Sequence, residues 1–507
     1  MSHWGRFAAP LLRAASAARA WRFRRALDDA QRAQATTLRR IVRAAAATAR
    51  GRRLGLDGSE DYTSFRIKVP LCSYSDLADD IARQRRDAVN LVTPGRVQVY
   101  EPTSGSGGAA KAIPYNAALL GSFRSLFAIW AHDLLVHLLQ PRSGRVFVSV
   151  SPAFGADGGI ADDRDYLGSL QRLLLQRFVV APPRGCPDLA SFRRELAVAL
   201  LRKPDLEVIS VWNPGYLLVL MDAIEQREPA LLRRLPAGAR RVLEHEANPW
   251  PLLWPQLQLV SCWTAAAAAL PAKELARRLP QTHIQGKGLL ATEAPITVPL
   301  FDAGGCVPLV DEVVLEFDAG DGHCRPLHEV EQGGEYALIV TQAAGLLRYR
   351  LGDRVRVSGR YGDAPLLEFV GRSDAVSDLV GEKLDEALVV TALAEAAADA
   401  GYAVLLPLQP DRGLPRYLCL AERVDASLAT RLDAALHRGL RYAEARALGQ
   451  LAPLQAAAVH GLRERVLAFW LDAGLRWGDI KDRALVSNHA HARRLVAALH
   501  GDQRSER

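Results

Sequence analysis

The feature that most restricts the fold of this 507-residue chain is an alternation of apolar strand segments with amphipathic helices in its middle part. Strands are predicted at 145–151, 206–212 and 257–263, and helices at about 164–178, 188–202, 214–226 and after the alanine run 265–269. Consecutive parallel strands need a long crossover, which is usually a helix. The middle of the chain is therefore expected to be an α/β domain with a largely parallel sheet.

Strand patterns dominate the next part of the sequence, from about residue 283 to 370, as at 312–317 and 336–340. This part predicts an antiparallel sheet or a small barrel. An α+β pattern begins after the tetrapeptide Gly-Arg-Ser-Asp at 371–374, and its elements are a helix at 384–399, strands at 403–408 and 416–421, and helices near 426–448. We therefore predict a large domain at 56–373 and a small C-terminal domain at 374–507.

The first 55 residues differ in charge from the rest of the chain. They contain 13 Arg, no Lys and two acidic residues, which is a local charge of +11, whereas the whole chain carries +8. A basic helical arm at 1–55 predicts a weak contact with an anionic surface, or a transit-like segment, and a solvated pair of amphipathic helices is the simpler interpretation. Because the arm carries none of the motifs described below, we expect it to be dispensable for activity.

Composition excludes several classes of protein. Apolar residues make up 49% and charged residues 24% of the chain, which is ordinary for a soluble globular enzyme. No stretch approaches the roughly 20 apolar residues that span a bilayer. Six cysteines without a CxxC pair predict neither a disulfide framework nor a cysteine zinc site, so we expect a cytoplasmic location. No zinc finger or aromatic-rich RNA motif accompanies the basic arm, so no nucleic-acid substrate is expected.

A glycine-rich loop lies between a short predicted strand at 97–100 and a long apolar-periodic helix at about 117–139. The loop has three glycines, three hydroxyl residues and a terminal lysine: Thr103, Ser104, Gly105, Ser106, Gly107, Gly108, Ala109, Ala110 and Lys111. Its N–H groups and hydroxyls can surround the oxygens of a polyphosphate without a steric clash. The loop is not a Walker A motif, its match to a dinucleotide motif is weak, and a plain surface loop remains the alternative.

Two acidic residues lie in patterns that suit nucleotide binding. Thr292 and Glu293 end the apolar stretch 289–293, and a buried carboxylate there needs a cation such as Mg²⁺ or a hydrogen-bonding partner. An edge residue that faces solvent is the alternative. The stretch Tyr349 to Asp353 ends a predicted strand with an acid that can accept two hydrogen bonds from a ribose diol, although a Gly-Asp turn is also common without any ligand.

Two further motifs lie toward the C-terminus, at 371–374 and in the stretch Gly-Asp-Ile-Lys-Asp-Arg at 478–483, with Lys481 in a predicted turn. Lys is rare in this chain, with seven Lys among 64 basic residues. A chain so rich in Arg is expected to keep Lys where a compact ammonium is needed. Lys111 and Lys481 are two of the seven, but each motif taken singly is more often structural than catalytic.

Taken together and in this order, the motifs resemble those of the adenylate-forming superfamily, and most closely the GH3 acyl acid–amido synthetases in a bacterial-type form. The resemblance covers about residues 60–490. Its GH3 features are the spacing of residues 345–353 and the group Trp254, Pro255, Leu257, Val260 and Trp263. The resemblance implies an adenylate-forming α/β fold, with a large N-terminal α/β domain that includes a β-barrel-like part and a small α+β C-terminal lid domain.

The resemblance also implies a role for each motif. Glu293 would hold Mg²⁺ and, with Lys481, would be catalytic, and the tetrapeptide at 371–374 would be the hinge of a rotating small domain. The residues expected to bind ATP are Thr103, Ser104, Gly105, Ser106, Gly107, Gly108, Lys111, Thr292, Tyr349, Asp353 and Arg372.

The implied reaction is the attack of a small carboxylic acid on the α-phosphorus of ATP, followed by transfer of the acyl group to an amine, which we expect to be an amino acid. Lys481 would offset the charge that gathers on the carboxylate and the α-phosphate. An acyl-CoA synthetase and a degenerate adenylate-binding protein are the alternatives, and the presence of Lys481 and Glu293 argues against the latter. The sequence contains neither GxSxG nor HExxH, which disfavours a serine hydrolase and a zinc peptidase.

Overall fold

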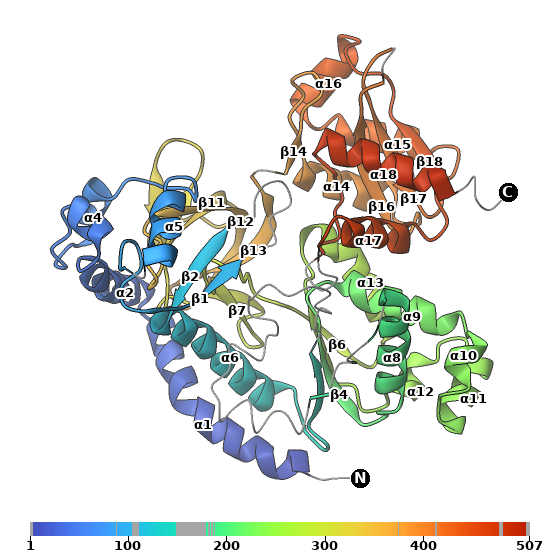
Figure 1. Cartoon of the computed structure of the whole chain (residues 1–507), viewed down its shortest axis with the longest axis horizontal. Coiled ribbons are helices and arrows are strands. Elements are labelled where there is room, and N and C mark those ends of the chain that lie inside the picture. The colour runs from blue at the N-terminus through green and yellow to red at the C-terminus, as the bar shows by residue number, and fades with distance from the viewer. Residues whose placement is uncertain are drawn as a thin grey trace. The chain divides into compact units, whose positions relative to one another are not determined.

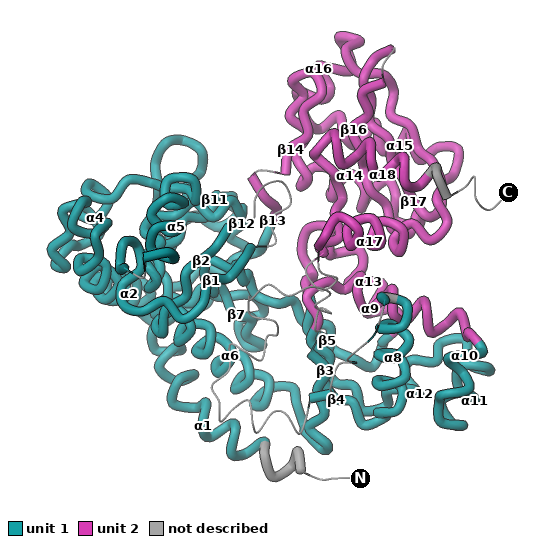
Figure 2. Tube along the Cα trace, viewed as in Figure 1, with its two compact units in different colours: residues 1–210, 229–262, 279–369 teal, residues 211–228, 263–278, 370–507 magenta. Residues whose placement is uncertain are grey.

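The computed structural model describes residues 4–87, 89–103, 111–148, 179–180, 183, 186, 188–373, 375–410, 413–475 and 480–502. The chain divides into two compact units, coloured separately in Figure 2. Unit 1 contains residues 1–210, 229–262 and 279–369, and unit 2 contains residues 211–228, 263–278 and 370–507. The domain limits at 55/56 and 373/374 stay predictions, because this division follows contacts and not stretches of continuous sequence.

Unit 1 contains the parallel sheet that the alternating pattern predicts. Its strands, in spatial order, are β3 (Arg145–Val148), β4 (Leu206–Ser210), β5 (Leu259–Cys262) and β6 (His283–Gly286), and every neighbouring pair is parallel. The helices in this part of unit 1 are α8 (Leu189–Leu201), α10 (Pro229–Leu232), α11 (Ala237–His245) and α12 (Trp250–Leu253). β6 corrects the expectation that antiparallel strands begin at residue 283, because it extends the parallel sheet. The helix predicted at 164–178 lies outside the described residues.

The other strands of unit 1 form antiparallel sheets. A five-stranded sheet has the order β10 (Cys324–Pro326), β9 (Val314–Asp318), β11 (Glu335–Thr341), β12 (Tyr349–Tyr361) and β13 (Ala364–Arg372). Two hairpins accompany it, β1 (Val97–Pro102) with β2 (Ala112–Asn116), and β7 (Thr297–Leu300) with β8 (Gly305–Pro308). Side chains from these strands and from α6 (Ala117–His137) form one large hydrophobic core, with Tyr115, Phe123, Phe317 and Tyr349 among its largest members.

The helix α6 is long and apolar enough to cross a membrane, by length and composition alone. This differs from the expectation that no stretch of the sequence is apolar over such a length. Core helices pass the same test. The buried face of α6, which includes Leu119 and Leu126, packs into the core of unit 1.

The basic N-terminal segment is part of unit 1. It forms α1 (Trp4–Leu27), α2 (Ala30–Ala45) and α3 (Ala49–Arg53), which α4 (Tyr62–Lys68) and α5 (Ala78–Asp87) follow, and α1 runs along α6 (Figure 1). Phe23 and Leu27 of α1 are fully buried in the large core, and Val42 of α2 is buried in a second hydrophobic cluster. Removing residues 1–50 would expose these core contacts, so the burial of this segment argues against the expectation that it is dispensable for activity.

Unit 2 combines two segments from the middle of the chain with its C-terminal part. The middle segments hold α9 (Pro214–Glu225) and α13 (Ala269–Arg278), the latter preceded by a 3-10 turn at Ala266–Ala268. The C-terminal strands are β14 (Val376–Ser377), β15 (Leu384–Asp385), and the sheet β16 (Ala403–Leu408), β17 (Arg416–Ala421) and β18 (Gln455–Ala458). The helices that accompany them are α14 (Glu386–Ala396), α15 (Leu428–Leu436), α16 (Leu440–Ala447), α17 (Leu462–Asp472) and α18 (His489–Asp502).

Candidate active site

The glycine-rich loop follows β1 and precedes β2 in the sequence, and these two strands pair antiparallel. Pro102 pairs with Ala112, and the backbone N–H of Thr103 donates to the carbonyl oxygen of Lys111 at 3.0 Å, which closes the loop at its base. The chain was expected to pass from the loop directly toward the helix, but β2 intervenes. The predicted phosphate-binding residues Ser104, Gly105, Ser106, Gly107 and Gly108 lie outside the described residues.

The two ends of this loop carry polar groups that suit an anion. The Oγ1 atom of Thr103 is buried and has no hydrogen-bond partner among the described residues. A buried hydroxyl without a partner is costly, so such a group is commonly satisfied by a ligand or by water. Lys111, at the other end of the loop, has a partly exposed side chain whose ammonium can approach a bound anion.

Glu293 lies in a tight turn in which Ala291 and Ala294 exchange backbone hydrogen bonds of 3.1 and 3.2 Å. An isolated bridge between Leu290 and Pro295 closes this turn. Glu293 is 7% exposed, which excludes the alternative of an edge residue that faces solvent. The phenol of Tyr115 donates to the carbonyl oxygen of Thr292 at 2.5 Å, so a side chain from β2 fixes the same turn.

Three predicted site residues meet at the carboxylate of Glu293. The Nζ atom of Lys111 lies 3.9 Å from Oε1 of Glu293 and donates to the hydroxyl of Tyr349 at 3.4 Å. This hydroxyl donates in turn to Oε1 of Glu293 at 3.3 Å. A buried carboxylate is tolerated where a cation and a donor accompany it, and this cluster supplies both.

Tyr349 and Asp353 belong to β12, but the strand begins at Tyr349 and does not end at Asp353, which corrects the sequence-based expectation. The reversal of the chain precedes Tyr349, where the N–H of Gln342 donates to the carbonyl oxygen of Leu346 at 2.9 Å. The pairing of β12 with β11 shifts its register opposite residues 351–353, which is a β-bulge. Gly352 has a φ of +88°, a conformation that favours glycine, and Asp353 is 6% exposed.

Arg348, which sequence reasoning did not single out, positions Tyr349. It has a φ of +48°, and its guanidinium forms a buried ion pair with Glu316, with N···O distances of 2.9 Å. The backbone on both sides of Tyr349 bonds to Cys72, at 3.0 Å from Cys72 N to Arg348 O and at 2.8 Å from Arg350 N to Cys72 O. A pairing of this kind between distant segments leaves no periodic signal in the sequence.

The other two predicted residues with described positions belong to unit 2. Arg372 is the last residue of β13, and Asp374 of the expected hinge lies outside the described residues. Lys481 is exposed, and its Nζ atom lies 5.4 Å from the centre of the Trp263 ring. An aromatic face at this distance attracts an ammonium group.

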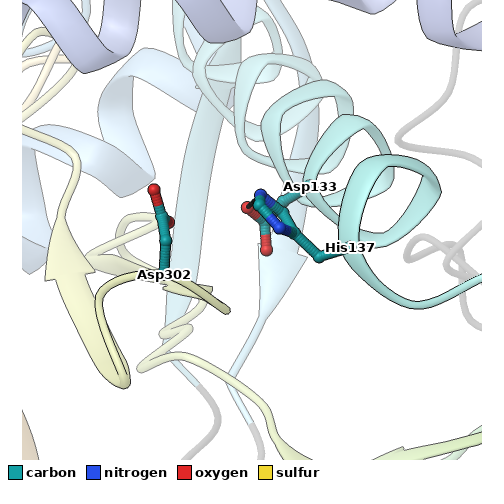
Figure 3. A group of neighbouring side chains, drawn as sticks. All are labelled: Asp133, His137 and Asp302. Carbon is teal, nitrogen blue, oxygen red and sulfur yellow. Dashed lines mark ion pairs between the residues drawn. The ribbon is translucent and has the colours of Figure 1, made fainter.

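One group of described residues has the spacing of metal ligands, namely Asp133, His137 and Asp302 (Figure 3). Arg24 of α1 already supplies the positive charge, because its guanidinium donates to Asp133 at 3.0 Å and to Asp302 at 3.3 Å. Desolvation opposes ionisation of Asp302, but the hydrogen bonds from Arg24 and Tyr361 hold the pKa of this carboxyl below its usual value. The group is therefore an ion-pair network that ties α1 to α6 and to the β7–β8 turn.

Comparison with known proteins agrees with this arrangement. The GH3 family N-terminal domain matches residues 19–248 and the GH3 family central domain matches residues 315–372, which together are more than half of the chain. The chain belongs to the GH3 family. The first match begins within α1, which is a further reason to treat most of the basic segment as part of the GH3 fold.

Similar proteins include both curated sequences and solved structures. The indole-3-acetic acid-amido synthetase GH3.4 of Arabidopsis thaliana is 41% identical over 406 residues, which is 66% of each chain. The chain spans about half to two thirds of the length of the curated GH3 relatives to which it aligns over long stretches.

The solved structures establish the fold. An acyl acid amido synthetase, AtGH3.15 in complex with 2,4-DB, superimposes with a TM-score of 0.81 at 18% identity, covering 95% of this chain and 96% of that one. A 2-hydroxyisobutyryl-CoA ligase in its postadenylation state superimposes with a TM-score of 0.58 at 13% identity, covering 92% and 91%. The expected adenylate-forming α/β fold is confirmed.

Proposed function

We propose that this GH3 protein is an AMP-forming ligase that adenylates a carboxylic acid with ATP and transfers the acyl group to the amine of an amino acid. The observation that carries the proposal is the meeting of Lys111, Glu293 and Tyr349. This contact joins the base of the glycine-rich loop to the motifs at 292–293 and 349–353, as a site for a nucleoside triphosphate requires. Two GH3 proteins to which the chain is similar are amido synthetases by name, which supports the same activity.

ATP would lie with its phosphates against the loop between Thr103 and Lys111. The buried, unpartnered Oγ1 of Thr103 and the ammonium of Lys111 are groups that suit phosphate oxygens. We assign the ribose to Asp353, which lies at the β12 bulge, and further nucleotide contacts to Thr292, Tyr349 and Arg372.

The donor chemistry at Glu293 fits Mg²⁺. Magnesium commonly takes one or two protein carboxylates and completes its shell with phosphate oxygens and water. Glu293 supplies such a carboxylate, and Lys111 offsets its charge without occupying both oxygens, since Lys111 and Tyr349 both contact Oε1. When bound, Mg²⁺ would offset the charge of the phosphates.

In the first step the substrate carboxylate attacks the α-phosphorus and pyrophosphate leaves. Negative charge gathers on the carboxylate and on the α-phosphate as they approach, and we assign Lys481 to offset it. We propose a large domain at 56–373 and a small domain at 374–507. The hinge about which the small domain would rotate between the two half-reactions is assigned to residues 371–374.

In the second step the amine attacks the acyl carbon and AMP leaves. The family membership favours an amide product over a thioester of coenzyme A. We also assign the chain to a bacterial-type branch of the family, as the resemblance of its motifs implies.

An ATP–pyrophosphate exchange screen over carboxylic acids tests the adenylation step, and exchange with at least one acid is expected. With that acid, mass spectrometry of products formed with each of the twenty amino acids and with coenzyme A tests the second step. An acyl-CoA formed faster than any amide would replace the amide assignment, and a lack of exchange with every acid would refute the ligase assignment.

A further inference from the structure

The segment that carries Lys481 packs on the start of α9, within unit 2. Asn213 is the N-cap of α9, because its Oδ1 accepts from the N–H of Gly215 at 2.8 Å. The amide of the same side chain donates to the carbonyl oxygen of Ile480 at 2.9 Å, and Asn213 is 4% exposed. Ile480, the residue before Lys481, is therefore bonded to the N-cap residue of α9.

Lys481 itself lies against a pair of tryptophans, Trp263 and Trp212. Its Nζ atom lies 5.4 Å from the ring of Trp263, and this ring lies 5.8 Å from the ring of Trp212. The backbone N–H of Trp263 also donates to the carbonyl oxygen of Trp212 at 2.8 Å, so the two tryptophans are held together. We name Trp212, Asn213, Gly215 and Trp263 the docking seat.

Asp482 makes the closest approach to this seat. A Cβ atom added at Gly215 would lie 2.5 Å from Oδ2 and 2.9 Å from Oδ1 of Asp482, which is closer than real Cβ atoms come to any heavy atom. Gly215 is the second residue of α9 and has no positive φ. The position therefore needs glycine for the space that the Asp482 carboxylate occupies and not for an unusual backbone conformation.

The surroundings of Asp482 include a small cavity and a second charged residue, Arg463. The Oδ2 atom of Asp482 and the Nε atom of Arg463 are both buried without a hydrogen-bond partner among the described residues, and both residues line one cavity of about 20 Å³. Such a cavity has room for about one water molecule that could join two groups of opposite charge. Desolvation raises the pKa of Asp482, and the charge of Arg463 and a side-chain hydrogen bond with Asn213 oppose this shift.

The chain is held differently on the C-terminal side of Asp482. Leu405 of β16 donates to the carbonyl oxygen of Ala484 at 2.8 Å and accepts from the N–H of Val486 at 3.0 Å. The C-terminal sheet thus fixes residues 484–486, whereas the contacts with the docking seat place residues 480–482.

We propose that Asp482 is a positioning residue for Lys481, and that its close approach to Gly215 seats residues 480–482 so that the Lys481 ammonium is placed for adenylate formation. This inference rests on the proposed function. It names the surface that places Lys481, the catalytic residue of that proposal. Misplacing a reacting group by about 1 Å can cost about 100-fold in rate. A methyl group at Gly215 would force the Asp482 carboxylate to move by several tenths of an ångström or more, and the proposal predicts that this shift displaces Lys481.

The test compares Gly215→Ala, Asp482→Ala and the double variant Gly215→Ala/Asp482→Ala. ATP–pyrophosphate exchange at saturating acid and ATP reports adenylate formation, and the reaction of a supplied acyl adenylate with amine reports the second step. Gly238→Ala is the matched control, because Gly238 is likewise the second residue of a helix, α11, and a Cβ there would meet nothing within 4 Å. Thermal unfolding of each variant reports any loss of fold.

Gly215→Ala and Asp482→Ala should each lower the exchange rate by about tenfold or more, while the KM for ATP and the second step change less than about twofold. The double variant should be no slower than Asp482→Ala, because removal of the carboxylate leaves room for the methyl group. Gly238→Ala should leave both half-reactions unchanged.

Additive losses in the double variant, or equal losses in both half-reactions, would overturn the positioning role. Asp482→Ala keeps the native glycine, so it tests the role even if Gly215→Ala does not fold. Lys481→Ala separates this inference from the proposed function. If Lys481→Ala lacks exchange and Asp482→Ala retains it fully, the docking seat is wrong, whereas full exchange by Lys481→Ala would refute the role assigned to Lys481 itself.

Discussion

The Nζ atom of Lys111 lies 3.9 Å from Oε1 of Glu293, although one residue ends a hairpin loop and the other lies in a turn far along the chain. The phenol of Tyr349 contacts both groups, at 3.4 and 3.3 Å. An ammonium, a buried carboxylate and a hydroxyl from three separate segments therefore form one polar cluster. Each segment carries a motif that the proposed ligase would use for ATP.

Glu293→Gln should lower Mg²⁺-dependent pyrophosphate exchange by about 100-fold, because the neutral amide offers a much weaker magnesium ligand and leaves Lys111 without its countercharge. The measurement is exchange as a function of Mg²⁺ concentration. Glu368→Gln is the control, since Glu368 is exposed on β13 and its ion pair with Arg356 has an N···O distance of 4.0 Å. Unchanged Mg²⁺ dependence in Glu293→Gln would refute the metal role.

Asp353→Ala should raise the KM for ATP by about tenfold or more with a smaller effect on the exchange rate at saturation, because the carboxylate is assigned to the ribose and not to the reacting phosphorus. Exchange kinetics over a range of ATP concentrations provide the check. Asp363→Ala, at an exposed position between β12 and β13, should leave this KM unchanged. A variant at Asp353 with the native KM would contradict the ribose assignment.

Lys481→Ala should abolish measurable exchange, whereas a supplied acyl adenylate should still react with amine at a rate within severalfold of the native protein. The reason is that the ammonium offsets charge in the phosphoryl-transfer step and has no equivalent task in the attack of the amine. Separate assays of the two half-reactions decide the matter. Equal losses in both assays would show that Lys481 acts elsewhere or only stabilises the fold.

Arg24→Ala should destabilise the fold by about 2–3 kcal/mol, because Asp133 is a buried carboxylate and would lose its cation together with Asp302. Urea unfolding measures the change. Arg22→Ala is the control, since the exposed Arg22 side chain donates to the carbonyl oxygen of Ala18 in its own helix, and it should change stability by less than about 0.5 kcal/mol. Equal stability of the two variants would show that the network does not anchor α1.

Acid should weaken a further ion-pair cluster, at Glu274 of α13. Hydrogen bonds from Arg277, and then from Arg278, lower the pKa of Glu274 from 4.5 to about 2, although desolvation raises it. The folded-state pKa is below the unfolded value, so the contribution of Glu274 to stability is present above pH 4.5 and is lost as the pH falls toward about 2. Urea midpoints of the native protein and Glu274→Gln should therefore converge across this range, and a constant difference would contradict the prediction.

Much of the candidate site could be located in the sequence, but its geometry could not. The loop ending in Lys111 and the acids Glu293 and Asp353 are recognisable because each belongs to a short motif of fixed spacing. Their mutual distances depend on how the hairpin, the turn and β12 pack. The structure also starts β12 at Tyr349, because a chain reversal and a pairing with Cys72 precede it, and neither has a periodic signature.

The sequence by itself determined many of the strands and helices of this protein, because such an element is encoded by the spacing of apolar residues within it. The strands expected at 403–408 and 416–421 are β16 and β17 without any change of bounds. Only the tertiary structure decided that the basic N-terminal segment is part of the core and that Asp482 lies against Gly215. Such contacts join residues far apart in the chain, and they depend on the shape and burial of the partner surface, which local spacing does not encode.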